Sequence, residues 1–426
     1  MLAHAAAQGV IRADEAARAM AERMPTVRRE FPMLAPHLAD AEVEQNKTRL
    51  VHRLTHRCAR CRQASSSSPR EHANALGGRL SAALIAVDHR TGEVIAHVGS
   101  PGYLDEARFG AVDMTGAVRS PGSTLKPIIY GLAFEAGLAH PETLIEDRPT
   151  RFGVYVPKNF DQDWHGTVTV RMALAQSLNI PAVKVLEALG PPRLFGRLAQ
   201  VGVTPVLPKG AEPTLAIALG GLGLRLSDLA SALRRARPRR RAHRPEVPAR
   251  RQPMPSRRGD ARRLLSPVAA WYVADILRNA PAPANAKPGE LAYKTGTSYG
   301  FRDAWAVGYD GRHTIAVWVG RPDGAATPGS RRPHRRRAAL LFDAFARLAP
   351  RRAPLPAAPS GALNVAGRRP AAAAQALPRG EDESAARRLS RACRADRLPA
   401  RPLRARRRRW RQRRASSSRP RAARCR

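Results

Sequence analysis

Three features are scarce in this sequence, and each scarcity excludes a class of protein. The 426 residues include only four cysteines, Cys58, Cys61, Cys393 and Cys425, and all four lie outside the segments with regular hydrophobic patterning. A small fold held together by disulfides is therefore excluded, while the redox compartment stays open. No run of about 18 apolar residues occurs, so we expect no transmembrane helix, and residues 1–4 open no signal peptide.

Lysine is the third scarce feature, with seven copies among 74 basic residues, so that 67 are arginine. The formal net charge of +40 would suit a polyanion partner, but proteins that bind polyanions usually draw on both basic residues. Thirteen arginines lie in 234–263 and 23 lie in 351–426. The basic character therefore belongs to two segments rather than to the chain as a whole.

One group of residues has the chemistry of metal ligands. His52, His56, Cys58 and Cys61 follow the pattern H-x3-H-x-C-x2-C within an irregular segment. This spacing is not one of the usual zinc patterns, and nothing beside it predicts a stable scaffold. We therefore expect neither a metal nor a cofactor.

Regular patterning runs from about residue 79 to residue 350 and predicts an α+β fold, an antiparallel sheet flanked by helices. Alternating apolar runs predict strands at 80–87, 93–99, 291–298, 304–309 and 314–320. Helices are expected from about Ser123 and at 172–178, 182–189, 264–277 and 340–348, with further helix in the first 40 residues. The basic segments are expected to be disordered.

A serine and a lysine lie at the start of the helix expected from Ser123. Pro127 is tolerated only in the first turn of a helix, which places Ser123 and Lys126 on one face at the helix N-terminus. The N–H groups there favour negative charge, and a desolvated lysine has a lowered pKa and can accept a serine proton. On this motif alone, a helix-capping serine beside a solvated lysine is the favoured interpretation.

Two further short motifs follow in a fixed order. Ser177-Leu178-Asn179 is expected near a helix end closed by Pro181, and Lys294-Thr295-Gly296-Thr297 is expected on a strand. Singly, the first could cap a helix and the second could be the solvated face of an edge strand. In this order, the three motifs resemble the S-x-x-K, S-x-N and K-T-G set of serine acyltransferases that react with penicillin.

The wider sequence resembles the class A penicillin-binding proteins, nearest to their 1C type. The runs that carry this resemblance are 119–137, 141–147, 155–160 and 264–277. The resemblance covers about residues 71–233 and 264–350, together with the first 40. It implies a penicillin-binding transpeptidase fold and a D,D-transpeptidase that cross-links peptidoglycan stem peptides ending in D-Ala-D-Ala and that also binds β-lactams.

The resemblance also implies a role for each catalytic residue. Ser123 would attack the penultimate D-Ala carbonyl, and Lys126 would be the base. Ser177 would pass a proton to the leaving group, and Asn179 would position the base and the substrate amide.

A second set of roles concerns substrate binding. Lys294 with Thr295 and Thr297 would bind the substrate carboxylate, and the backbone N–H groups of Ser123 and Thr297 would form an oxyanion hole. Gly296, which has no side chain, would let the substrate lie against the strand as an added β-partner.

The sequence departs from the family both outside this domain and within it, where the basic run stands in place of a helix expected between the S-x-N and K-T-G motifs. We expect 1–42 to be the remnant of a glycosyltransferase domain, 43–70 an irregular linker, 71–350 the transpeptidase domain interrupted by the basic run 234–263, and 351–426 an Arg-rich disordered tail. Members of the family act at the periplasmic face of the inner membrane. This chain is expected to lack the signal and the anchor, as well as the polymerising half.

We interpret the basic segments as the products of a GC-rich gene that is translated in the wrong reading frame. Such a shift should yield arginine, alanine, proline and serine without lysine. Reading the DNA in all three frames tests this hypothesis. The competing interpretation is an inactive remnant whose Arg-rich segments bind nucleic acid or anionic surfaces, for example through 404–414. We do not favour nucleic acid as a partner, because the arginine-rich segments contain neither neighbouring lysines nor regularly spaced aromatic residues.

Overall fold

The structure is a computed structural model that describes residues 2–21, a few isolated positions between 36 and 77, and 79–363 apart from 90, 239–262, 284–285 and 328–330. The four cysteines, the H-x3-H-x-C-x2-C pattern, and the segments 239–262 and 364–426 lie outside the described residues. Before the main body, the helices are α1 (Leu2–Ala7) and α2 (Ala13–Ala21).

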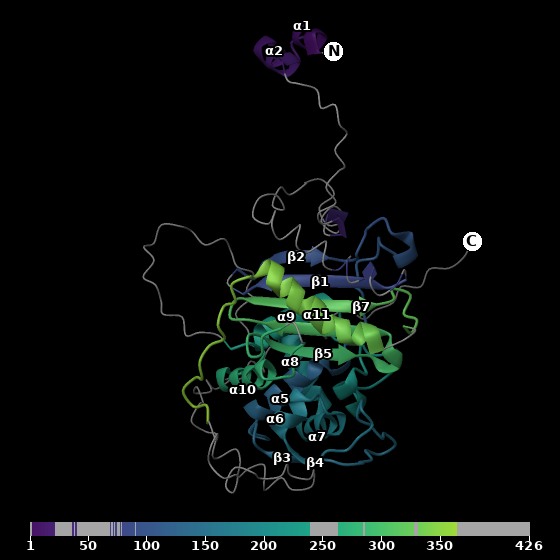
Figure 1. Ribbon diagram of the computed structural model, residues 1–426, viewed down its shortest axis with the longest axis vertical. Coiled ribbons are helices and arrows are strands. Elements are labelled where there is room, and N and C mark those ends of the chain that lie inside the picture. The colour runs from purple at the N-terminus through teal and green to yellow at the C-terminus, as the bar shows by residue number, and fades with distance from the viewer. Residues whose placement is uncertain are drawn as a thin grey trace, which may run out of the picture.

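A five-stranded antiparallel sheet forms the centre of the molecule (Figure 1). Its strands are β1 (Ser81–Asp88), β2 (Val94–Val98), β5 (Ala292–Thr297), β6 (Asp303–Tyr309) and β7 (His313–Gly320). The order across the sheet is β2-β1-β7-β6-β5, and Ser81 pairs with Gly320 while Asp88 pairs with His313. The five strands predicted in this sheet are confirmed, and the β1–β7 pairing joins the two ends of the domain.

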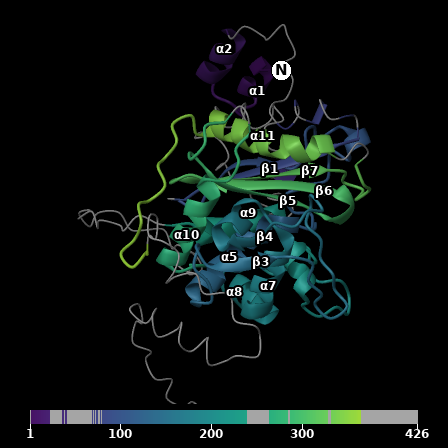
Figure 2. The same cartoon turned by 60° about the horizontal axis from the view of Figure 1, so that its bottom comes forward.

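Both faces of the sheet are covered. All eight residues of β1 are buried because alternate side chains enter two different cores. Ile85 and Val87 belong to the larger core, which includes residues of α5 and α9, whereas Leu84 and Ala86 belong to a smaller core with residues of α11. Figure 2 shows α11 on one side of the sheet and α5, α9 and α10 on the other.

The helices of the larger layer are α5 (Lys126–Glu135), α6 (Val170–Ala175), α7 (Asn179–Leu189), α8 (Pro191–Gln200), α9 (Leu226–Ala236) and α10 (Pro267–Arg278). The opposite face carries α11 (Arg331–Leu348). A two-stranded sheet, β3 (Leu144–Asp147) with β4 (Gly166–Thr169), precedes α6. Short 3-10 turns are η2 (Glu106–Arg108), η3 (Gly122–Leu125), η4 (Leu215–Leu219) and η5 (Tyr299–Phe301).

Several helix boundaries predicted from the sequence are wrong, and two of them lie next to the motifs. The helix expected from Ser123 begins at Lys126, after the 3-10 turn η3. Pro181 does not close a helix but lies in the first turn of α7, which begins at Asn179. Proline is compatible with this position because the N–H groups of a first turn have no helical acceptor.

The edges of the basic segments also differ from the prediction. Arg234 was expected to open the irregular run 234–263, but Arg234 and Ala236 are buried in the last turn of α9. The helix predicted at 340–348 begins earlier, since α11 starts at Arg331. The first residues of the predicted basic run therefore belong to the folded domain.

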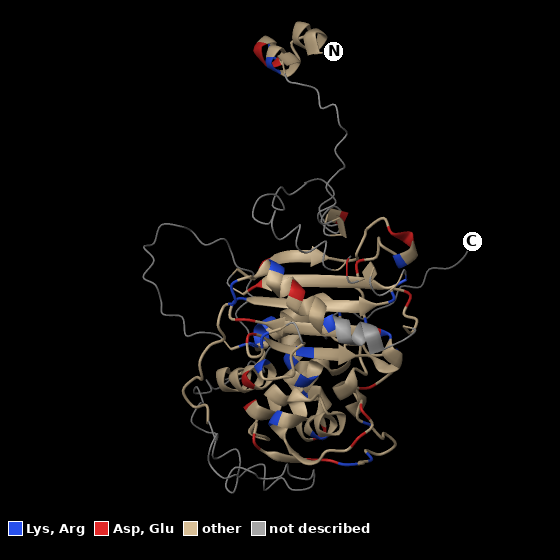
Figure 3. Cartoon of the chain, in the orientation of Figure 1, with Lys and Arg blue, Asp and Glu red and all other residues tan. Residues whose placement is uncertain are grey.

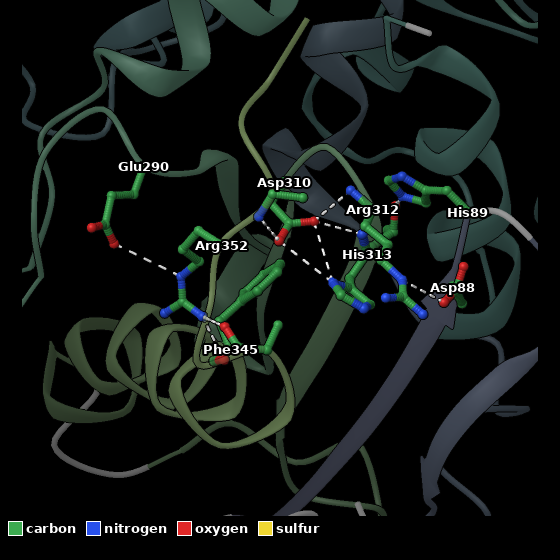
Figure 4. Close-up of polar contacts among 11 residues, drawn as sticks. Asp88, His89, Glu290, Asp310, Arg312, His313, Phe345 and Arg352 are labelled. Atoms are coloured by element: carbon green, nitrogen blue, oxygen red, sulfur yellow. Dashed lines mark hydrogen bonds and ion pairs between the residues drawn. The ribbon is translucent and has the colours of Figure 1, made fainter. Parts of the chain in front are cut away.

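Residues 351–363 pack against the body and do not form the start of a disordered tail. Ala353 N donates to Asp310 Oδ2 at 3.1 Å, and Gly311 N donates to Ala353 O at 2.8 Å. Leu363 N donates to the Tyr272 hydroxyl at 2.8 Å. Figure 4 shows Asp310 at the centre of the first group of contacts and Arg352 near Glu290 and Phe345. The expected tail is thus wrong for 351–363, and its remainder lies outside the described residues.

Charge is balanced over most of the folded body, whereas α11 and the edges of the basic segments add an excess of arginine. Residues 79–233 and 264–327 together hold 20 lysines and arginines against 19 aspartates and glutamates, and Figure 3 shows the two signs interspersed over the described elements. No helix within the described part of the chain is long and apolar enough to cross a bilayer.

Candidate active site

Two glycines bring the Ser123 turn against strand β5. Gly122 has a φ of 53°, in the left-handed region, and a Cβ there would lie 2.3 Å from Thr297 O. A Cβ on Gly296 would lie 2.3 Å from Pro121 O. Both positions therefore require glycine for this close approach.

This packing corrects the explanation offered for Gly296. The missing side chain was expected to make room for a substrate lying along the strand. In the structure, the space that a side chain would need is already filled by Pro121 O and by Thr124 Cγ2, 2.7 Å from an added Cβ. Gly296 thus permits contact between β5 and η3.

Lys126 is fully buried at the start of α5 and anchors the S-x-N segment. Its Nζ donates to Ser177 O at 2.7 Å, Leu178 O at 3.0 Å and Asn179 Oδ1 at 2.7 Å. Among the described contacts of Lys126 Nζ, none is a hydrogen bond to Ser123. Such catalytic contacts are often long before substrate binds.

The hydroxyl of Ser177 lies between two buried lysines. Ser177 Oγ accepts a hydrogen bond from Lys294 Nζ at 2.7 Å and lies 3.5 Å from Lys126 Nζ. The φ of Ser177 is 64°, a left-handed conformation that costs a residue with a side chain about 1–3 kcal/mol. The loop between α6 and α7 thus holds this hydroxyl in place at an energetic cost.

Burial lowers the pKa values of both lysines. For Lys126, desolvation and the charge of Lys294 hold the pKa well below its usual value. For Lys294, desolvation and the charge of Arg337 lower the pKa to about 7. Because two like charges share one small site, the pair favours a state in which one lysine is neutral.

The threonines of the K-T-G motif lie on the same strand as Lys294. Strand β5 pairs with β6, placing Thr295 opposite Ala306 and Thr297 opposite Ala304. Lys294 Nζ also donates to Thr295 O at 2.8 Å. Main-chain atoms of Thr297 lie against Gly122, one residue before Ser123. The structure therefore brings the three motifs together around the start of α5.

Sequence reasoning missed two polar residues next to this site, Asp147 and Asn159. Asn159 Oδ1 accepts from Asn179 N at 2.8 Å, and Asn159 Nδ2 donates to both carboxylate oxygens of Asp147. Both residues fall in runs that carry the family resemblance, but they follow no fixed spacing relative to the three motifs. Only their burial, at 0% and 4% exposed, marks them.

Comparison with known proteins identifies the class of this domain. Residues 82–205 match the family described as "Penicillin binding protein transpeptidase domain". Among solved structures, PonA1 from Mycobacterium tuberculosis in complex with penicillin V has a TM-score of 0.55 and 19% identity, covering 74% of this chain and 93% of that chain. Penicillin-binding protein 1A from Haemophilus influenzae has a TM-score of 0.53 and 18% identity, covering 66% and 50%. The fold is that of a penicillin-binding transpeptidase.

A curated relative narrows this class to a family. Penicillin-binding protein 1C of Escherichia coli (strain K12) is 39% identical over 337 residues, which make up 77% of this chain and 42% of that protein. The chain belongs to the class A penicillin-binding proteins. It spans less than half the length of this relative. The family and fold predicted from the sequence are confirmed.

Proposed function

We propose that the chain is a peptidoglycan D,D-transpeptidase that forms an acyl-enzyme on Ser123. The observation that carries the proposal is the Ser177 hydroxyl, which lies within reach of two buried lysines beside the turn that holds Ser123. A hydroxyl flanked by two amines whose pKa values are lowered is suited to relay protons at neutral pH.

In the acylation step, Lys126 accepts the proton of Ser123 while the serine Oγ bonds to the penultimate D-Ala carbonyl carbon. A neutral lysine amine has two N–H donors and one lone pair, so it can keep two of its three hydrogen bonds and take the proton with the lone pair. The C–N bond to the last D-Ala breaks, and the leaving amine receives a proton through Ser177. Asn179 holds Lys126 and the substrate amide.

The K-T-G strand binds the substrate. Lys294, Thr295 and Thr297 bind the terminal carboxylate, and the N–H groups of Ser123 and Thr297 stabilise the oxyanion by about 3 kcal/mol for each donor. In the second step, the amine of a neighbouring stem peptide attacks the acyl carbon, forms the cross-link and releases Ser123. A β-lactam enters as a mimic of the donor and stays attached to Ser123. Its binding is supported by the penicillin V complex of the related fold.

The wider organisation belongs to the same proposal. Residues 1–42 derive from the end of a glycosyltransferase domain, 43–70 form a linker, and the transpeptidase domain extends to about residue 350 with its docked segment 351–363. By family resemblance, the site works at the periplasmic face of the inner membrane. Binding of nucleic acid is not favoured, because residues 79–233 and 264–327, which form most of the folded body, have balanced charge.

Labelling with a fluorescent penicillin tests the proposal. Wild-type protein should take up the label covalently, and Ser123→Ala should not, while circular dichroism shows that both are folded. Absence of label on folded wild-type protein, or equal label on Ser123→Ala, would overturn the assignment of Ser123.

A further inference from the structure

Asp147, the last residue of β3, is a buried carboxylate without an ion-pair partner among the described residues. Its side chain is 0% exposed and accepts hydrogen bonds from Asn159 Nδ2, at 2.9 Å and 2.8 Å to its two oxygens. His165 N also donates to Oδ2 at 3.0 Å. Burying a carboxylate with neutral donors only is costly. A position that keeps such a group needs a reason beyond packing.

Asn159 connects this carboxylate to the S-x-N motif. Its Oδ1 accepts from Asn179 N at 2.8 Å, while its Nδ2 faces Asp147. The amide can be oriented in only one way, because a backbone N–H must meet the oxygen and a carboxylate must meet the nitrogen. Asn179 is held a second time, as its Nδ2 donates to Lys158 O at 2.7 Å. The Asn179 side chain in turn accepts from Lys126.

Asp147 also acts on Lys126 through its charge. Desolvation and Lys294, from β5, lower the pKa of Lys126, whereas Asp147, from β3, raises it. On α5 itself, Tyr130 is the other group affected by Asp147, which adds to the effect of burial in raising the tyrosine pKa. Among the described charged groups that act on Lys126, Asp147 is the negative one. It offsets part of the lowering of the Lys126 pKa by burial and by Lys294.

We propose that Asp147 and Asn159 are positioning residues of the acylation site: Asn159 fixes Asn179, and Asp147 fixes Asn159 and places a buried negative charge at the end of the hydrogen-bonded chain that leads through Asn159 and Asn179 to Lys126. Neither residue touches the reacting atoms. The inference rests on the proposed function, because it assigns Lys126 as the base. It separates two contributions, charge from Asp147 and geometry from Asn159.

Asp147→Asn tests the charge, since the substitution preserves shape. The rate of acylation by penicillin is followed across pH. Without Asp147, Lys126 loses its proton at lower pH, so the acid limb of the rate profile should move to lower pH. A structural role alone would slow acylation without moving that limb. A limb that stays in place overturns the charge assignment.

Glu146→Gln is the matched control. Glu146 is the preceding residue of β3, about half exposed, and it bonds to Arg148 and Thr167 rather than to the site. The substitution removes the same charge one position away. The pH profile should remain that of the wild type, and an equal shift in both variants would overturn the specific role of Asp147.

A direct titration keeps this test independent of activity. The chain has seven lysines, so NMR of protein labelled with 13C at the lysine Cε can follow Lys126, assigned with Lys126→Arg. Lys126 should titrate at lower pH in Asp147→Asn than in wild type or Glu146→Gln, and an unchanged titration overturns the inference. If penicillin does not label wild-type protein, the proposed function fails, but this readout still decides on Asp147.

Asn159→Ala tests the geometric contribution. This second variant also keeps the proposal testable if Asp147→Asn does not fold. The variant leaves Asn179 N without its acceptor but keeps the Asp147 charge. Acylation should slow by about 10- to 100-fold, because small displacements of a catalytic group have effects of this size. Its acid limb should move less than that of Asp147→Asn. A wild-type rate in folded Asn159→Ala overturns the positioning role.

Discussion

At the scale of single residues, Ser177 combines a left-handed backbone with a hydroxyl held between two lysines. Neither feature follows from the S-x-N pattern, which would fit a helix cap equally well. The left-handed backbone of Ser177 is explained if the loop between α6 and α7 holds Oγ in a functional position at the expense of stability. The proposed role of Ser177 as a proton relay can therefore be tested by removing the hydroxyl alone.

Ser177→Ala should slow penicillin acylation by about 10²- to 10⁴-fold, the usual contribution of a positioned proton donor or acceptor. Thermal stability should change little, since the backbone stays strained and only one hydrogen bond is lost. Stopped-flow labelling gives the rate. Ser231→Ala, on α9, is the control and should label at the wild-type rate; a fast Ser177→Ala would refute the relay.

The lowered pKa of Lys294 predicts how the free energy of unfolding depends on pH. Its pKa is about 7 in the folded protein, against 10.5 for the unperturbed group. Between these values the unfolded chain binds a proton that the folded chain does not, so the free energy of unfolding should rise with pH from about 7 to about 10.5. Lys126, whose pKa is also lowered, adds a contribution of the same sign.

Urea unfolding at a series of pH values measures this rise. In Lys294→Met the rise should be smaller than in wild type by a few kcal/mol at most, because one of the two contributing groups is gone. If the variant keeps the full wild-type dependence, Lys294 does not titrate as proposed.

At the scale of elements, the contact between η3 and β5 holds the site together. Gly122 and Gly296 allow the two backbones to touch, and this contact places the Ser123 turn beside the K-T-G strand. The contact joins residues far apart in the sequence. It depends on two missing side chains, so a single methyl group should disturb it.

Gly296→Ala should lower the free energy of unfolding by about 1–3 kcal/mol, because its Cβ would meet Pro121 O at 2.3 Å. Penicillin labelling should also decrease, since η3 and β5 are forced apart. Gly196→Ala is the control: no atom lies within 4 Å of its added Cβ, and the residue lies inside α8. That control should gain about 0.5–1 kcal/mol. Equal behaviour of the two variants would contradict the contact.

Elements with a clear period were predictable from the sequence. The strands of the main sheet alternate or are wholly apolar, and all five lie where the pattern placed them. The start of α7 was not predictable, because Pro181 suits the first turn of a helix as well as the position after its end. The three motifs could be named from their order. The Asp147–Asn159 pair could not, because its significance comes from tertiary contacts.

At the scale of the whole molecule, the folded domain is larger than its hydrophobic pattern indicates. Residues 351–363 lack apolar periodicity, yet their backbone completes the hydrogen bonding of the Asp310 turn (Figure 4). Their backbone also contacts the Tyr272 hydroxyl on α10. A Cβ on Gly311 would lie 2.3 Å from Pro354 O, so this turn also packs closely on the segment. Composition alone could not separate these residues from the arginine-rich sequence that follows.

Truncation tests this boundary. A chain that ends at residue 363 should melt within about a degree of the full chain. A chain that ends at residue 350 should melt several degrees lower, about 4–8 °C for each kcal/mol lost in a small domain and less in a larger one. Calorimetry compares the two. Equal melting temperatures would show that 351–363 contributes nothing to the domain.

The central claim, that Ser123 is the nucleophile, is tested most directly by locating a penicillin adduct. Trypsin does not cut efficiently before proline, so it leaves both Lys126–Pro127 and Arg148–Pro149 intact, and one peptide, 120–151, contains both Ser120 and Ser123. Fragmentation of this peptide by mass spectrometry should place the added penicillin mass on Ser123. An adduct on Ser120 or elsewhere, or folded protein that carries no adduct, would contradict the account.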